Sequence, residues 1–358
     1  MRGPTRASAV AVLAAGLAAF APVGAKALVF QTINDPAQPP FNGVTFTNLM
    51  GINSSDLIAG FYGSGQAGDP NTGFLLTLPN TFTPDNFHFP AMPNFAQTQI
   101  TALNDIGTRT GYTYPTNLGV PFDFQFGFYE KGGVFTMVNN PKTPDCSVSG
   151  DCDPGVITEN QLIGVNNEDL AVGFYNDRHG NSHGYTYDIA TKTFSADIND
   201  PSAVSTVAAA INNSDEIAGF YTDAMGVIHG FLDNGGVFMT VNAPGASETQ
   251  LLGLNDHGLA VGFDVVNGVM NGILFNSNLD VFTNINPPGS MGTTLNGLND
   301  LNQLVGFYVD DAGNTDGLLV TGVPEAPTWA MMLMGFVVLG TALTFERSRS
   351  RAPLMAGS

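Results

Sequence analysis

GLNDHGLAVGF, at residues 253–263, decides the fold because the same phrase returns through the whole chain. It joins a small residue, an aliphatic residue and an asparagine to a short polar turn, and then to an apolar strand that ends in Gly-aromatic. Six copies occur, with their asparagines at Asn53, Asn104, Asn166, Asn212, Asn255 and Asn299. The spacings between these asparagines are 51, 62, 46, 43 and 44 residues. Self-similarity at this period indicates a repeat architecture.

Each copy continues with two more strand-length segments. The third segment starts with glycine and an apolar run, at Gly73, Gly127, Gly184, Gly230, Gly272 and Gly317. The fourth follows Phe-x-x-[Val/Ile]-Asn-x-Pro at 135–141, 238–244 and 282–288, with variants at 194–201 and 87–93. Four strands in about 45 residues is typical of a β-propeller blade. No 3.6-residue periodicity competes with this pattern, so the chain is predicted to be all-β.

The last copy ends at Val320 without its fourth segment, and that segment stands instead near the N-terminus. Residues 30–36 read Phe-Gln-Thr-Ile-Asn-Asp-Pro, which is the missing phrase. A strand from the start of the chain that completes the last copy would leave no open edge. The sequence therefore predicts a six-bladed β-propeller over residues 28–322. A two-sheet arrangement or an open solenoid of the same repeats is the alternative.

The copies also resemble the HAF family of extracellular repeats. The best matches to that pattern of Gly-[Ile/Leu]-Asn, a turn, an apolar strand and a following aromatic phrase are residues 164–185, 210–232 and 253–274. The resemblance covers nearly all of the body. It implies an extracellular repeat protein and brings no defined enzymatic activity with it.

Residues 1–27 have the features of a secretory signal peptide. Arg2 and Arg6 precede an apolar run from Ala7 to Val23, and Ala25-Lys26-Ala27 supplies the small-x-small pattern for cleavage by signal peptidase. We therefore expect the protein to be exported, in the cell envelope or outside the cell.

Residues 323–351 resemble the PEP-CTERM sorting signal. The motif is Val323, Pro324, Glu325, Ala326 and Pro327, with alanine at the third position of the Pro-Glu-Pro-like phrase. An uncharged segment at 330–345 follows Trp329, and then Arg347, Arg349 and Arg351. These features predict a transmembrane helix whose basic end stays on the cytoplasmic side of the inner membrane before processing. The resemblance implies recognition by an exosortase-type transpeptidase in a Gram-negative bacterium of a kind that often makes exopolysaccharide. A simple single-span anchor is the alternative.

The charge of the body excludes one class of partner. Of the 31 acidic residues, all but Glu325 and Glu346 lie within 28–322, whereas only five of the 11 basic residues do. The body therefore carries a net charge of about −24. Such a surface repels phosphate backbones, so nucleic acid is not an expected partner.

A few residues stand out as candidate sites. Cys146 and Cys152, the only cysteines, are expected to form a disulfide in an oxidising compartment. The repeated asparagines either line a ligand-binding ring or serve turn chemistry, and their presence in every copy favours the turn. Asp177, Asp223 and Asp310 are expected in hairpin turns, with Ca²⁺ binding as the alternative. His183 and His229 share one repeat position and are expected to pack, although His179 and His183 could chelate a metal.

No catalytic motif is recognised in the sequence. We therefore predict a non-catalytic interaction module without a resident cofactor or metal site, apart from the Ca²⁺ alternative. Its partners would be exopolysaccharide or a surface protein. The competing hypothesis is a carbohydrate-active hydrolase or lyase on a propeller scaffold, which should reveal itself as nonrepeating polar residues in the central channel.

Overall fold

The computed structural model describes residues 27–36, 46–64, 71–87, 96–115, 124–148 and 150–323. This part of the chain contains 24 β-strands and no helix, so the all-β prediction is confirmed for it. The described residues accordingly include no helical segment that could span a membrane. The described residues from Leu28 onward belong to one compact unit. The predicted cleavage of the signal peptide and the predicted C-terminal helix fall outside the described residues.

Each sequence copy folds into four strands. The first has β2 (Thr47–Ile52), β3 (Leu57–Tyr62), β4 (Thr72–Thr77) and β5 (Thr81–Pro84); the second has β6 (Ala96–Leu103), β7 (Arg109–Pro115), β8 (Phe124–Lys131) and β9 (Val134–Val138). The third has β10 (Thr158–Val165), β11 (Leu170–Asn176), β12 (Ser182–Asp188) and β13 (Thr193–Phe194); the fourth has β14 (Ala203–Ile211), β15 (Ile217–Asp223), β16 (Ile228–Asn234) and β17 (Val237–Val241). The fifth has β18 (Glu248–Leu254), β19 (Leu259–Val266), β20 (Val269–Asn276) and β21 (Val281–Asn284); the sixth has β22 (Gly292–Leu298), β23 (Leu304–Val309) and β24 (Thr315–Thr321), joined by β1 (Val29–Ile33).

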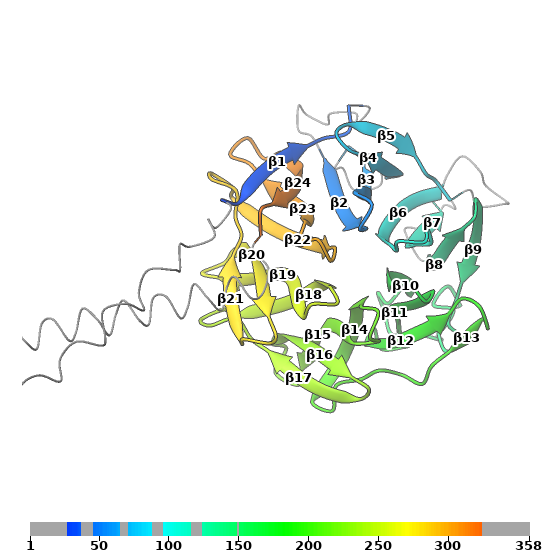
Figure 1. Ribbon diagram of the computed structural model, residues 1–358. Coiled ribbons are helices and arrows are strands. Elements are labelled where there is room, and N and C mark those ends of the chain that lie inside the picture. The colour runs from blue at the N-terminus through cyan, green and yellow to red at the C-terminus, as the bar shows by residue number, and fades with distance from the viewer. Residues whose placement is uncertain are drawn as a thin grey trace, which may run out of the picture. The chain divides into compact units, whose positions relative to one another are not determined.

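The strands of every copy pair in an antiparallel meander, and the sheets stand around a common axis in a propeller-like arrangement (Figure 1). The first strand of each copy lies nearest this axis; we call β2, β6, β10, β14, β18 and β22 the inner strands. Copies 1, 4, 5 and 6 form separate four-stranded sheets. Copies 2 and 3 share an eight-stranded sheet, because β8 and β10 pair in parallel at Thr158↔Phe124 and Glu159↔Gln125.

The glycine that begins each Gly-aromatic phrase is required by the backbone geometry. The inner strand of every copy carries a bulge, for example between Leu162 and Gly164. A Cβ atom on Gly173 would lie 1.9 Å from the carbonyl oxygen of Gln161, and one on Gly262 equally close to that of Gln250. A Cβ atom would likewise clash with a backbone carbonyl oxygen at the equivalent Gly60, Gly111, Gly219 and Gly306. Only glycine therefore fits where the second strand crosses the bulge.

A large apolar side chain fills the space between neighbouring sheets in each copy. It directly follows the third-segment glycine and is at most 1% exposed in every case: Phe74, Phe128, Tyr185, Phe231, Ile273 and Leu318. Burial of such a side chain contributes roughly 1.5–3 kcal/mol. The repeated Gly-aromatic or Gly-aliphatic pair thus supplies the core of each sheet-to-sheet contact.

The predicted closure by the N-terminal segment is confirmed. β1 pairs antiparallel with β24, from Val29↔Thr321 to Ile33↔Gly317. Beyond the strand, Asn34 donates to the Asp316 carboxylate at 2.8 Å and accepts from the Gly317 N–H at 3.1 Å. Ile33 packs in one apolar cluster with residues of the first and last copies, including Leu49 and Leu319. Residues more than 280 positions apart are thereby joined in one sheet.

Replacing Ile33 with alanine tests this closure. Ile33 is 7% exposed, whereas Val29 on the same strand is 49% exposed. Ile33→Ala is expected to lower the free energy of unfolding by about 2–5 kcal/mol, because it removes buried methyl groups. Val29→Ala should change it by under about 0.5 kcal/mol. Denaturant unfolding of both variants provides the measurement, and equal effects would contradict the role of β1.

Candidate functional site

The six repeated asparagines sit where each inner strand turns into the second strand. Asn212 is representative: its side-chain oxygen accepts the N–H groups of Ser214 and Glu216, both at 3.0 Å. The fourth residue of each turn has a positive φ, and it is Asp56, Gly107, Asp169, Asp215, Gly258 or Asn302. Asparagine, aspartate and glycine are the residues that tolerate this region. The turn chemistry expected from the sequence is confirmed.

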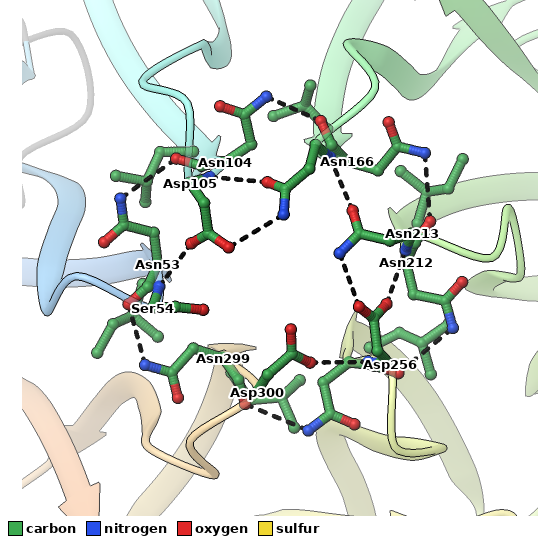
Figure 2. Close-up of a pocket in the computed structure, with 18 residues that line it drawn as sticks. Asn53, Ser54, Asn104, Asp105, Asn166, Asn212, Asn213, Asp256, Asn299 and Asp300 are labelled. Atoms are coloured by element: carbon green, nitrogen blue, oxygen red, sulfur yellow. Dashed lines mark hydrogen bonds between the residues drawn. The ribbon is translucent and has the colours of Figure 1, made fainter.

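The same asparagines also connect neighbouring copies, which the sequence analysis missed. Each side-chain amide donates to the backbone carbonyl of the equivalent asparagine in the next copy (Figure 2). The distances are 3.2 Å for Asn53 to Asn104, 2.8 Å for Asn104 to Asn166, 3.2 Å for Asn166 to Asn212, 3.3 Å for Asn212 to Asn255, 3.2 Å for Asn255 to Asn299 and 3.0 Å for Asn299 to Asn53. The six bonds close into a circle, which we call the asparagine ring.

One signal in the sequence could have revealed this role. Aspartate caps such turns as well as asparagine does, and yet all six copies have asparagine. Only the amide can donate a hydrogen bond, because an ionised carboxylate only accepts. The presence of asparagine rather than aspartate in all six copies is therefore explained by the hydrogen bond between copies.

A second circle of polar residues lies next to the asparagine ring. In five of the six copies, the residue after the asparagine donates its backbone N–H to the side chain of its counterpart in the next copy. Five such bonds of 2.7–2.9 Å are present: Ser54 to Asp105, Asp105 to Asn167, Asn167 to Asn213, Asn213 to Asp256, and Asp256 to Asp300. Together the two circles line a cavity of about 70 Å³ on the axis (Figure 2).

This cavity has a negative lining. Asp105, Asp256 and Asp300 supply three carboxylates, and none of the described residues that line it is lysine or arginine. The pKa of Asp300 is raised above its usual value, first by burial and then by repulsion from Asp256 and Asp105, against a lowering by the Asp256 N–H bond and by the charge of His257. The ionised form of Asp300 is therefore disfavoured in the folded protein.

A second cavity of about 80 Å³ on the axis is lined by inner-strand residues. Gly51, Ala102 and Gly164 are among them, together with the polar side chains of Thr101 and Asn296. One aliphatic residue from each copy borders both cavities: Ile52, Leu103, Val165, Ile211, Leu254 and Leu298. These side chains form an apolar girdle between the polar asparagine ring and the middle of the axis.

Neighbouring copies are also joined at the other end of the inner strands. In five of the six copies, the threonine or asparagine six positions before the repeat asparagine accepts an N–H from the loop that ends the preceding copy. The bonds join Asp35 to Thr47 at 3.3 Å, Phe87 to Thr98 at 3.0 Å, Asn140 to Asn160 at 3.1 Å, Asp200 to Thr206 at 3.2 Å and Ala243 to Thr249 at 3.0 Å. The copies are therefore hydrogen-bonded to one another at both ends of the axis.

The three aspartates considered for Ca²⁺ lie apart, in turns between second and third strands. The carboxylate of Asp177 accepts the N–H groups of His179 and Asn181 at 2.8 and 3.0 Å. Burial alone would raise the pKa of Asp177, but these and other hydrogen bonds lower it. Asp223 and Asp310 make equivalent turn bonds. Among the residues that the structure describes, no three His, Cys, Asp or Glu side chains gather as metal ligands.

His183 and His229 occupy equivalent positions with the same partners. His183 lies 3.3 Å from the Asp177 carboxylate, 3.2 Å from the Asn199 side chain and stacks on Tyr175. His229 meets Asp223, Asn242 and Tyr221 in the same way. His179 instead contacts Asp153, 3.0 Å away. The recurrence in two copies matches the packing role expected from the sequence.

Cys146 and Cys152 form the predicted disulfide. The insertion that contains them lies against the turn of the third copy, where the Asp153 N–H donates to the Arg178 carbonyl at 2.9 Å. Of the sorting motif, only Val323 lies within the described residues. Pro324, Glu325, Ala326 and Pro327, and the basic residues Arg347, Arg349 and Arg351, lie outside them.

Comparison with known proteins gives likeness in fold only. No family model matches the chain, and no curated protein matches it in sequence. One similar solved structure is AofleA from Arthrobotrys oligospora, with 10% identity, coverage of 82% of this chain and 86% of that chain, and a TM-score of 0.47. Another is a putative TolB from Agrobacterium tumefaciens, with 8% identity, 73% and 89% coverage, and a TM-score of 0.46. Virginiamycin B lyase from Staphylococcus aureus has 9% identity, 81% and 88% coverage, and a TM-score of 0.41. At these values the similarity carries no argument about function.

Replacing Asn53 with aspartate separates its two roles. Aspartate keeps the oxygen that accepts the N–H groups of Ser55 and Leu57 but loses the amide that donates to the Asn104 carbonyl. Asn53→Asp is therefore expected to lower the free energy of unfolding at neutral pH by about 1–3 kcal/mol, since a buried carbonyl loses one of its hydrogen-bond donors. The exposed Asn234→Asp is the matched control. Unchanged stability in Asn53→Asp would mean that the asparagine serves only its own turn.

Removing the charge of Asp300 should stabilise the protein at neutral pH. Its raised pKa means that the folded state holds this proton more tightly than the unfolded chain, so stability falls as the pH rises through that pKa. Asp300→Asn keeps an acceptor for the Asp256 N–H and should raise the melting temperature at pH 7 by about 1–3 °C. The gain should vanish near pH 3, where the wild-type Asp300 side chain is protonated and therefore as neutral as the asparagine of the variant. Asp311→Asn is the exposed control. A lower melting temperature at pH 7 would contradict this account.

Proposed function

We propose that the protein is an exported six-bladed β-propeller that acts as a non-catalytic interaction module at the cell surface. The observation that carries this proposal is the closed circle of six asparagine side chains, reinforced by the β1–β24 pairing. The polar residue that every copy shares is used to hold the ring together. A ring without an open edge is a rigid platform from which loops can contact a partner.

The blade count follows from treating the eight-stranded sheet as two blades. Only two residue pairs link β8 to β10, whereas within each copy the strands pair along most of their length. Each of the six copies also has its own asparagine turn and its own buried residue after the third-segment glycine. These repeated features support six equivalent blades.

The sequence of the two ends supports export and membrane sorting. Residues 1–27 have the pattern of a signal peptide, and 323–351 have the order of motif, apolar segment and arginine cluster that an exosortase-type enzyme would recognise. The body's own ends lie together, because Val29 is paired with Thr321. Val29 and Thr321 lie at the same end of the ring as the asparagine turns. Leu304 follows the turn that begins at Asn299, and it pairs with Val320, the neighbour of Thr321. A tether at that point would leave the opposite end of the ring facing outward.

The enzyme hypothesis remains the second candidate because of one observation. Glu159, on an inner strand, has a pKa raised by burial despite hydrogen bonds from Gln161 and Asn176. A carboxylic acid with a raised pKa suits general acid catalysis on a glycosidic bond. A hydrolase would lose turnover on Glu159→Gln, whereas an interaction module has no turnover to lose.

The mature ends of the protein test the proposal. Mass spectrometry of the protein recovered from the producing cells is expected to show a chain that starts at Leu28 and ends near Glu325, in the cell envelope or the medium. The variant with Pro324→Ala and Glu325→Ala should keep its C-terminal arginines and accumulate in the inner membrane. A wild-type chain that retains Arg351 would indicate a simple single-span anchor instead.

A further inference from the structure

The inner strands carry variable residues at the end of the axis opposite the asparagine ring. Six positions before each repeat asparagine stands a threonine or asparagine, which joins neighbouring copies in five of the six cases. Its two neighbours differ from copy to copy. Seven positions before are Phe46, Gln97, Glu159, Ser205, Glu248 and Gly292, and five positions before are Asn48, Gln99, Gln161, Val207, Gln250 and Thr294. Serine, glycine and valine in some copies show that the scaffold does not require an amide or a carboxylate here.

Copies 2 and 3 bring several of these polar side chains together. The Gln161 amide donates to the Gln125 oxygen at 2.5 Å and to the Glu159 carboxylate at 2.9 Å. The Asn176 amide donates to the other oxygen of Glu159 at 2.5 Å. The pairing of Glu159 with Gln125 across β10 and β8 fixes this arrangement. We call Gln125, Glu159, Gln161 and Asn176 the glutamine cluster.

The glutamine cluster is half-buried, and the described residues give it no positively charged partner. All four side chains keep some exposure to solvent, and within the described part of the chain the partners of the Glu159 carboxylate are amides. Burial of a carboxylate away from a cation is costly to the fold. Copy 4, with Ser205 and Val207 at the equivalent positions, forms the same four-stranded sheet, so the scaffold does not require this composition.

One aromatic residue lies on the same face of the sheet as Gln125. Tyr112 pairs with Gly127, two residues along β8 from Gln125, and its hydroxyl donates to the Gln99 side chain. Phe124 and Phe126 stack with ring centroids 5.9 Å apart, but as the immediate neighbours of Gln125 they face the other side of β8. Side-chain amides both donate and accept, which matches the hydroxyl groups of a sugar, and a tyrosine ring offers an apolar face to its C–H groups.

We propose that the glutamine cluster is the binding site of a neutral saccharide. This inference rests on the proposed function and names the ligand class and place of its interaction site. The net charge of about −24 on the body disfavours anionic polysaccharides. The site lies at the end of the ring that a tether near Val29 and Thr321 would leave accessible.

Binding of defined oligosaccharides tests the inference. The full chain in a detergent without a sugar head group would be titrated with cellohexaose, maltohexaose, xylohexaose and a galacturonic acid hexamer. At least one neutral hexamer is expected to bind, and the anionic hexamer is expected to bind at least tenfold more weakly. Gln161→Ala and Gln125→Ala should each weaken binding of the neutral hexamer at least tenfold.

Copy 5 provides the matched control. Gln250 donates to Glu248 at 2.6 Å in the same Glu-x-Gln arrangement, but Ile228 and Val265 stand where copies 2 and 3 have Gln125 and Asn176. Gln250→Ala should therefore leave the affinity unchanged, and thermal unfolding would verify that all variants fold. Binding of no neutral hexamer, or an equal loss in Gln250→Ala, would overturn the inference.

The outcome also separates this inference from the proposed function. Hydrolysis of a bound hexamer that is lost in Glu159→Gln would contradict the non-catalytic proposal while supporting the site. A surface-displayed protein with normal mature ends that binds none of the four hexamers would leave the proposed function intact and remove the site.

Discussion

The structure depends on one hydrogen bond repeated six times, from the side-chain amide of an asparagine to the backbone carbonyl of the next asparagine. Each of these asparagines is buried, at 3–6% exposure. Its oxygen meanwhile accepts the N–H groups of its own turn. One side chain therefore shapes a hairpin and also ties that hairpin to its neighbour. Repeat proteins are held together by nearest-neighbour contacts, and here the last contact returns to the first copy.

This constraint explains why the repeat tolerates so much variation elsewhere. The glycine at the bulge, the buried residue after the third-segment glycine and the threonine or asparagine on the inner strand complete the set that the scaffold needs. Other positions on the inner strands range from glycine to glutamate. Function resides in such grafted, nonrepeating residues rather than in the fold, which is why the glutamine cluster is the place where a ligand is proposed.

The fold could be predicted from the sequence because its determinants are local and repeated. The Gly-aromatic phrase gives the strands, and the displaced segment at 30–36 gives the closure that β1 and β24 make. The merging of copies 2 and 3 into one sheet was not predictable, since it depends on the close approach of β8 and β10. The disulfide between Cys146 and Cys152 followed from the presence of only two cysteines.

The candidate sites were less accessible to sequence reasoning. A turn explained the repeated asparagines well enough that their second bond went unnoticed, although the uniform amide was a visible clue. The glutamine cluster combines Gln125 of one copy with Glu159 and Asn176 of the next, and no spacing pattern shows that these residues meet. An alignment of the six copies also gives no information about residues that occur in one copy only.

Side-chain amide exchange measures the asparagine ring most directly. In the protein labelled with ¹⁵N at asparagine, the Nδ2 protons of Asn53, Asn104, Asn166, Asn212, Asn255 and Asn299 should exchange with solvent far more slowly than those of the exposed Asn234. Six protected amides are the predicted result. Rapid exchange at these positions would contradict the claim that their side chains close the ring.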